Sequence, residues 1–276
     1  SDLLARALGT EEGRLRATQG LQEIAPWVRI DTQRDTPERL AELMIRGVPK
    51  ESRTFGEYFS PRHYDLPPLP NLYFMRDSAF VVGKSLFLSR MAHTVREGET
   101  FLTELALSFG GAWKTGRVVR MTERIEGGDI AVISPTLIAA GISERTSPEA
   151  LDALAGEIAA DTGEATTVIG VVLPPKRSTI HLDMVFTQVD RELAVVHQGT
   201  LSSAQVIALT ATPDGGSEVK EHPCLQHALE THGHPMEFLR CGDDDPVSEA
   251  REQWLAAANT FALAPGVIVT LETNRA

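Results

Sequence analysis

The chain repeats one pattern four times: two short apolar, β-branched runs on either side of a turn, with a polar residue in front. Each copy has the signals of a β-hairpin. The polar heads are Asp77, Asp129, Asp183 and Asn259, and the turns lie at Gly83-Lys84, Ser134-Pro135-Thr136, Asp190-Arg191 and Pro265-Gly266. A pattern that recurs every ~50–75 residues is typical of solenoids, propellers and arrays. We therefore predict an α/β fold built from repeated units.

Helical periodicity follows the first three hairpins. Helices are predicted at residues 96–108, 148–159 and 223–231, with a strand-like segment at 203–210 before the third, and a further helix at 246–257. The unit is therefore hairpin, helix, strand. In a closed ring, equivalent strand ends converge on the axis, so we expect the polar heads to share one pocket. No helix follows the fourth hairpin before Ala276, and the array is expected to be incomplete.

The first 62 residues have a different pattern, with apolar residues at helical spacing. Asp35-Thr36-Pro37 predicts a helix N-cap followed by proline in the first turn, and Gly47 predicts a helix end. Three prolines between residues 67 and 70 indicate an extended connector. We predict a helical part at residues 1–64 and the repeated units at residues 65–276.

Composition excludes several classes of partner. The 276 residues are 42% hydrophobic, enough for a sizeable core, and the net charge of −12 argues against binding nucleic acid or an anionic membrane surface. No apolar run approaches the length of a membrane span. Two cysteines, Cys224 and Cys241, fit a reducing compartment, so we expect a cytoplasmic protein. The chain begins at Ser1 without an initiator Met, which suggests a trimmed or incompletely represented N-terminus.

His181 and Asp183 stand at the head of the third hairpin. On a strand, residues i and i+2 point to the same face, so we expect these two side chains to project together. Histidine titrates near neutral pH and a carboxylate can fix its charge or tautomer. The pair is therefore a candidate for proton transfer.

The segments that lead into the hairpins are rich in acids. Asp77, Glu126, Asp129 and Asp183, with His181, would bring four carboxylates and one imidazole to one point. Such a cluster repels itself unless a cation, a metal ion or a guanidinium lies there. Paired carboxylates suit a guanidinium particularly well, because its planar N–H fork matches bidentate acceptors.

Five blocks together resemble the arginine deiminase family. They are P-N-L-Y-F-M-R-D at 70–77, E-G-G-D at 126–129, G-I-S-E-R-T-S at 141–147, H-L-D at 181–183, and R-E-Q-W with A-N-T-F-A-L-A-P-G-V at 251–267. The resemblance implies a five-bladed α/β propeller of the guanidino-modifying (pentein) superfamily with an inserted helical subdomain, of which this chain holds about four blades. It also implies hydrolysis of L-arginine to L-citrulline and ammonia through a cysteine thiouronium intermediate, without a metal or organic cofactor.

The same resemblance implies roles for individual residues. His181 is the expected general acid and base, with Glu126 as its hydrogen-bonding partner. Asp77 and Asp183 are expected to grip the guanidinium. The residues expected to bind or shape the pocket around the amino-acid end of the substrate are Asn71, Phe74, Arg96 and Arg145, with Asp129 as a guanidinium contact or a support behind it.

The chain departs from the family in two respects. The family's nucleophilic cysteine lies beyond the last block, and nothing before Ala276 matches that motif. Cys241 stands among carboxylates that raise a thiol pKa, and neither it nor Cys224 suits the role. The family's N-terminal blade is also expected to be missing. The sequence is then the retained part of a complete enzyme, a trimmed form or a natural half-protein, and as written it is not expected to turn over arginine.

Other functions remain open at this level. The same scaffold would serve an amidinotransferase, a hydrolase of methylated arginine or agmatine, or an inactive arginine-binding protein. His222, Cys224, His227, His232 and His234 lie within thirteen residues, but their spacing matches no usual zinc pattern, so no metal site is predicted. Exposed edges of an incomplete array favour pairing with another copy, so a homo-oligomer is expected.

Overall fold

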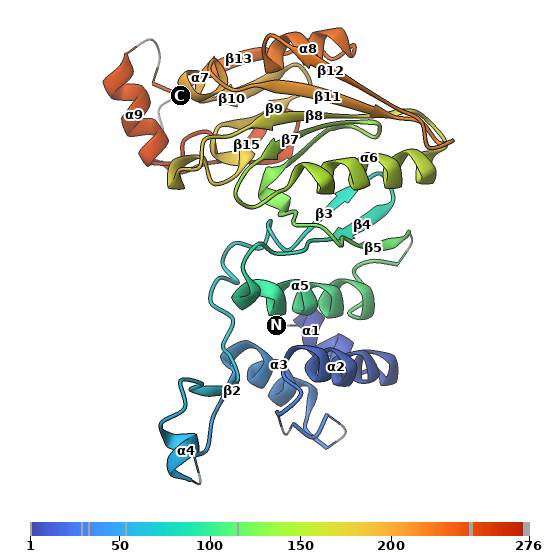
Figure 1. Ribbon diagram of the computed structural model, residues 1–276, viewed down its shortest axis with the longest axis vertical. Helices are drawn as coiled ribbons and strands as arrows, with labels where there is room; N and C mark the ends of the chain where they lie inside the picture. The colour runs from blue at the N-terminus through green and yellow to red at the C-terminus, as the bar shows by residue number, and fades with distance from the viewer. Residues whose placement is uncertain are drawn as a thin grey trace. The chain divides into compact units, whose positions relative to one another are not determined.

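The structure is a computed structural model that describes residues 2–28, 30–32, 34–52, 54–114, 116–242 and 245–272 (Figure 1). The chain divides into two compact units, 1–120 and 121–276. Among the described residues, no helix combines the length and the apolar composition that crossing a bilayer requires.

Helices open the first unit, as predicted. They are α1 (Asp2–Leu8), α2 (Glu11–Ile24) and α3 (Pro37–Arg46). Thr36 caps α3 by accepting a hydrogen bond from the Arg39 N–H, and Gly47 ends it with a φ of 75°, a conformation that favours glycine. Leu8, Leu40 and Leu105 belong to the core of this unit, so the helix after the first hairpin packs with the helical start.

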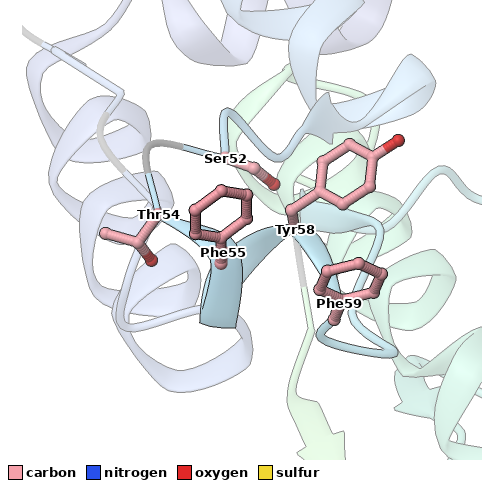
Figure 2. A pocket seen from close by; sticks show the side chains of 5 residues that line it. All are labelled: Ser52, Thr54, Phe55, Tyr58 and Phe59. Atoms are coloured by element: carbon pink, nitrogen blue, oxygen red, sulfur yellow. The ribbon is translucent and has the colours of Figure 1, made fainter.

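A short β-pair carries an exposed aromatic helix. Strand β1 (Val48–Pro49) pairs antiparallel with β2 (Tyr64–Leu66), and α4 (Phe55–Tyr58) lies between them with a Thr54/Glu57 capping box. Phe55, Tyr58 and Phe59 are exposed, and with Ser52 and Thr54 they line a surface hollow of about 380 Å³ (Figure 2). None of these residues belongs to the predicted site.

The first predicted hairpin completes this unit. Strands β3 (Ala79–Val82) and β4 (Ser85–Leu88) pair antiparallel across Gly83, whose φ is 58°. A 3₁₀ turn η1 (Thr94–Arg96), α5 (Glu97–Glu104) and a π-helical turn η2 (Leu105–Phe109) follow. Strand β5 (Val118–Arg120) then pairs parallel with β4. The order is hairpin, helix and parallel strand.

The second unit repeats that order twice. Strands β6 (Ile130–Ser134) and β7 (Leu137–Ile142) form a hairpin after the 3₁₀ turn η3 (Gly127–Asp129); α6 (Pro148–Thr162) follows, and β8 (Thr166–Val172) pairs parallel with β7. Strands β9 (Phe186–Asp190) and β10 (Leu193–Val196) form the next hairpin. Helices α7 (Gln198–Leu201) and α8 (Leu225–Thr231) follow it. Strand β13 (Glu237–Arg240) then pairs parallel with β10. The predicted unit is confirmed.

The strand-like segment before α8 follows the third hairpin in sequence, but it pairs with a strand of the second repeat. It forms β11 (Val206–Ala211), which pairs antiparallel with β8 and with β12 (Ser217–His222). The second repeat is thereby extended to a five-stranded sheet in the order β12-β11-β8-β7-β6, along which α6 and α8 run (Figure 1). Ile169 and Val171 of β8 share a core with Leu225 and Leu229 of α8.

The fourth hairpin is also confirmed. Helix α9 (Pro246–Trp254) leads into β14 (Phe261–Ala264), which pairs antiparallel with β15 (Val267–Val269). Both strands expose their apolar side chains, whereas the strands of the third hairpin contribute to a buried core.

One local expectation was wrong. His181 is extended, but Leu182–Met184 form a 3₁₀ turn, η5, and β9 begins only at Phe186. The alternation of a strand therefore does not govern the directions of the His181 and Asp183 side chains. The backbone turns at this point because Asp129 accepts a hydrogen bond from the Leu182 N–H, at 2.9 Å, in place of a strand partner.

Candidate active site

The first unit holds a buried arginine between two carboxylates. Arg96, at the end of η1, donates from Nη1 to Asp77 Oδ2 at 2.9 Å. Its Nε and Nη2 donate to Glu99 Oε2 at 3.1 and 2.8 Å. All three side chains are buried. Burial by itself lowers the pKa of Arg96, but the bonds to Glu99 and Asp77 outweigh it and hold the pKa above its ordinary value.

The P-N-L-Y-F-M-R-D segment is bound to the same arginine. The Asn71 N–H donates to Glu99 Oε1 at 3.1 Å, and the Phe74 carbonyl accepts from Arg96 Nη2 at 3.4 Å. Asn71 and the ring of Phe74 are exposed, and the ring meets Tyr73 edge to face. Four predicted site residues of this unit, Asn71, Phe74, Asp77 and Arg96, are therefore linked through one guanidinium and Glu99.

The second unit buries a histidine–carboxylate pair. His181 Nε2 lies 2.9 Å from Glu126 Oε2, and the other oxygen of Glu126 lies 3.5 Å from Arg145 Nη1. Glu126 is fully buried and His181 nearly so. When Glu126 is ionised its oxygens only accept, and the His181 nitrogen that faces it then carries a proton. This geometry holds the imidazole in one orientation.

Asp129 lies behind this pair. Its Oδ1 accepts from the Leu182 N–H at 2.9 Å, and its Oδ2 accepts from the Ser143 hydroxyl at 2.7 Å. Burial raises the pKa of Asp129 to about 7, against the opposing effects of His181 and of the hydrogen bonds that it accepts. A Cβ on Gly141 would collide with Asp129 Oδ1, so this close approach requires glycine.

The remaining hairpin heads lie near this region of the second unit. Asp183 is half-buried within η5. Asn259 is exposed, and its amide lies 3.5 Å from the sulfur of Met184, the residue after Asp183. In this unit the structure thus brings together Glu126, Asp129 and His181, as the convergence of strand ends predicts, and Arg145 lies beside Glu126. Asp77 belongs to the first unit.

Two positions were missed from the sequence. Glu99 holds Arg96 and the Asn71 backbone, and Ser143 holds Asp129. The i, i+3 spacing of Arg96 and Glu99 on a predicted helix would have indicated the first. Ser143 lies within the G-I-S-E-R-T-S block, but a serine in a loop has no distinctive pattern.

Cys241 lacks the surroundings of a nucleophile. Cys241 is buried, and burial together with Glu252 and Glu249 raises the pKa of its thiol to about 11. The predicted direction of the shift is confirmed, although burial is a larger cause than the carboxylates. Cys224 is half-buried at the start of α8.

The histidines near α8 form a cluster without metal-site geometry. His222 and His227 have their Nδ1 atoms 3.3 Å apart, and the ring of His232 lies 5.7 Å from that of His222. Across the described part of the chain, no three ligand atoms of this cluster lie within 4.8 Å of one another. Burial is the largest cause that lowers the pKa of His222 and of His232.

Comparison with known proteins agrees with the motifs. The family model of arginine deiminase matches residues 43–276. The chain belongs to the arginine deiminase family. The arginine deiminase of Mycobacterium avium is 34% identical over 253 residues, covering 86% of this chain and 61% of that protein. The enzyme of Treponema denticola is 34% identical over 255 residues, covering 86% and 62%. The chain therefore spans about three fifths of the length of these family members.

Two solved structures share the fold at low identity. Unliganded AgrE superposes with a TM-score of 0.50 at 18% identity, covering 72% of this chain and 24% of that one. The N-terminal domain of ArgZ, an arginine dihydrolase from Cyanobacteria, has a TM-score of 0.50 at 16% identity, covering 75% and 65%. Both agree with the mixed α/β architecture of this family member.

Proposed function

We propose that the protein to which this chain belongs is an arginine deiminase, which hydrolyses L-arginine to L-citrulline and ammonia. The observation that carries the proposal is the buried Glu126–His181 pair at 2.9 Å, formed by two of the family's sequence blocks. A histidine oriented by a buried carboxylate is suited to both protonation and deprotonation in one reaction cycle. Membership of the family supplies the substrate class.

In the proposed reaction a cysteine thiolate attacks the guanidinium carbon of arginine. His181 donates a proton to the departing nitrogen, so ammonia leaves and a thiouronium intermediate remains. His181 then takes a proton from a water molecule, whose oxygen attacks the same carbon. The C–S bond breaks and the thiolate is released. The added hydroxyl loses its remaining proton to solvent, and its oxygen becomes the carbonyl of the ureido group of citrulline. Because Glu126 occupies Nε2, Nδ1 of His181 exchanges the proton. The proposal requires a thiolate that neither Cys224 nor Cys241 supplies.

The other predicted residues bind the substrate in this proposal. Asp77 and Asp183 hold the guanidinium, since carboxylates match its N–H fork. Arg145 and Arg96 bind the substrate carboxylate, and Asn71 and Phe74 shape the surrounding pocket. The contacts of Arg96 with Asp77 and Glu99 favour a further role, which is to hold Asp77 in place.

The proposal extends to the architecture and the setting of the protein. A five-bladed α/β propeller accounts for the three hairpin–helix–strand units and the additional hairpin. We further propose a cytoplasmic homo-oligomer that works without a cofactor. Pairing through the exposed β14–β15 hairpin would suit such an assembly.

The test is a citrulline assay on the complete gene product, with intact mass measured on the same sample. We expect citrulline and ammonia in equal amounts, and no citrulline from His181→Asn. Agmatine, methylated arginine and an amine acceptor are included as competing substrates. A sample of 30.0 kDa that binds arginine without producing citrulline would support a non-enzymatic protein, and transfer to the amine would support an amidinotransferase.

A further inference from the structure

The hydroxyl of Ser143 uses its full hydrogen-bonding capacity. It donates to Asp129 Oδ2 at 2.7 Å and accepts from the N–H groups of Arg145 and Thr146 at 3.0 and 3.2 Å. A serine hydroxyl has one donor and two acceptor positions. Ser143 lies in the loop between β7 and α6, and its backbone N–H also donates to the Thr146 carbonyl at 3.1 Å. Its side chain is therefore held from three directions.

Two of the three partners of the Ser143 hydroxyl, Asp129 and Thr146, also bond to the backbone beside the histidine–carboxylate pair. Asp129 accepts from the N–H of Leu182, which is the residue after His181, at 2.9 Å. The Thr146 hydroxyl accepts from the backbone N–H of Glu126 at 3.2 Å. One short loop thus holds the backbone beside each member of a pair whose residues are 55 positions apart in sequence.

We propose that Ser143 is a positioning residue that sets the geometry of the Glu126–His181 pair through Asp129 and Thr146. It also orders Arg145 by accepting its N–H. This inference rests on the proposed function for its catalytic consequence, but its structural step stands on the contacts alone. Ser143 itself acts at a distance from the substrate.

Replacement of Ser143 by alanine removes one hydrogen bond from Asp129 and leaves two backbone N–H groups without their acceptor. The loop and the Leu182 backbone are then less restrained. A misplacement of ~1 Å in a catalytic group costs ~100-fold in rate, so we expect Ser143→Ala to lower kcat by ~10–100-fold and to change KM less. Ser143→Thr retains the hydroxyl and should recover most of the loss.

Ser147 provides a matched control in the same loop. Its hydroxyl accepts from the Ala150 N–H at 3.3 Å and caps α6. Ser147→Ala therefore deletes a hydroxyl of equal size and lowers the melting temperature. We expect its kcat and KM to stay within about twofold of the parent protein, because the hydroxyl bonds to the first turn of α6 and the backbone bond from the Ser147 N–H to the Arg124 carbonyl, at 2.9 Å, is retained in alanine.

The experiment combines citrulline kinetics on the complete gene product with hydrogen exchange at the Leu182 amide. Loss of the Ser143 contact should speed exchange at Leu182 by ~10-fold in Ser143→Ala and leave it unchanged in Ser147→Ala. Unchanged exchange in Ser143→Ala, or an equal loss of kcat in both alanine variants, would overturn the inference. If the parent protein makes no citrulline while Leu182 exchange still depends on Ser143, the proposed function fails and the positioning role stands.

Discussion

Replacement of Glu126 by glutamine tests the central feature of the site. Glutamine has nearly the same shape, so the change removes the negative charge while it retains the packing of a fully buried side chain. The ionised carboxylate accepts from His181 at 2.9 Å and faces Arg145 at 3.5 Å. The glutamine amide has only one acceptor oxygen, and its NH2 group is a donor. One of the two contacts is therefore lost, because the NH2 group would face an N–H of His181 or of Arg145.

The magnitude follows from the strength of these contacts. A hydrogen bond to a charged group contributes about 1.5–3 kcal/mol, and 1.36 kcal/mol is tenfold in rate, so the lost bond alone predicts a loss of ~10–150-fold in kcat. Loss of the orienting carboxylate of a catalytic histidine reaches ~10⁴-fold in serine proteases. We therefore expect kcat for citrulline formation to fall by ~10²–10⁴-fold in Glu126→Gln.

The assay is steady-state citrulline formation by the complete gene product, with Glu144→Gln as the control. Glu144 is an exposed carboxylate in the same loop as Arg145, and only its backbone carbonyl accepts a bond from Arg124. Circular dichroism and the melting temperature verify the fold of both variants. A Glu126→Gln protein that is folded and retains more than one tenth of the parent kcat would refute the role assigned to the buried carboxylate.

Three further predictions concern neighbouring features. Gly141→Ala places a methyl group against Asp129 Oδ1 and should destabilise the protein by about 1–3 kcal/mol, whereas Gly156→Ala on α6, where a Cβ meets open space, should stabilise it by about 0.5–1 kcal/mol in urea unfolding. Burial raises the folded pKa of Asp129 from 3.8 to about 7, so its protonated form favours the folded state and that contribution is lost as the pH rises from about 4 to 7. Asparagine does not titrate, so the free energy of unfolding of Asp129→Asn, relative to that of the parent protein, should be higher at pH 8 than at pH 5. An equal difference between the two proteins at both pH values would contradict this pKa. Cys241, buried and with a thiol pKa of about 11, should be alkylated by iodoacetamide at pH 8 more slowly than Cys224, as peptide mass spectrometry can measure.

Local patterns in the sequence were sufficient to predict most of the elements. Each hairpin was predicted by two β-branched runs and a turn whose residues suit it, such as Gly83 with its positive φ. The N-cap at Thr36 depends on a hydrogen bond within three residues. The expected grouping of Glu126 with His181 came from the repeat, because equivalent ends of neighbouring units meet.

Tertiary contacts decided what local patterns could not express. The strand alternation expected at His181 and Asp183 is replaced by a 3₁₀ turn because a buried carboxylate 53 positions earlier binds the Leu182 N–H. Segment 206–211 follows the third hairpin in sequence, yet it pairs with β8 of the preceding unit, since a strand joins the edge that offers free N–H and carbonyl groups. Ser143 gained its importance in the same way. A serine in a loop has no distinctive sequence pattern, and only the folded chain brings Asp129 Oδ2 to 2.7 Å from the Ser143 hydroxyl.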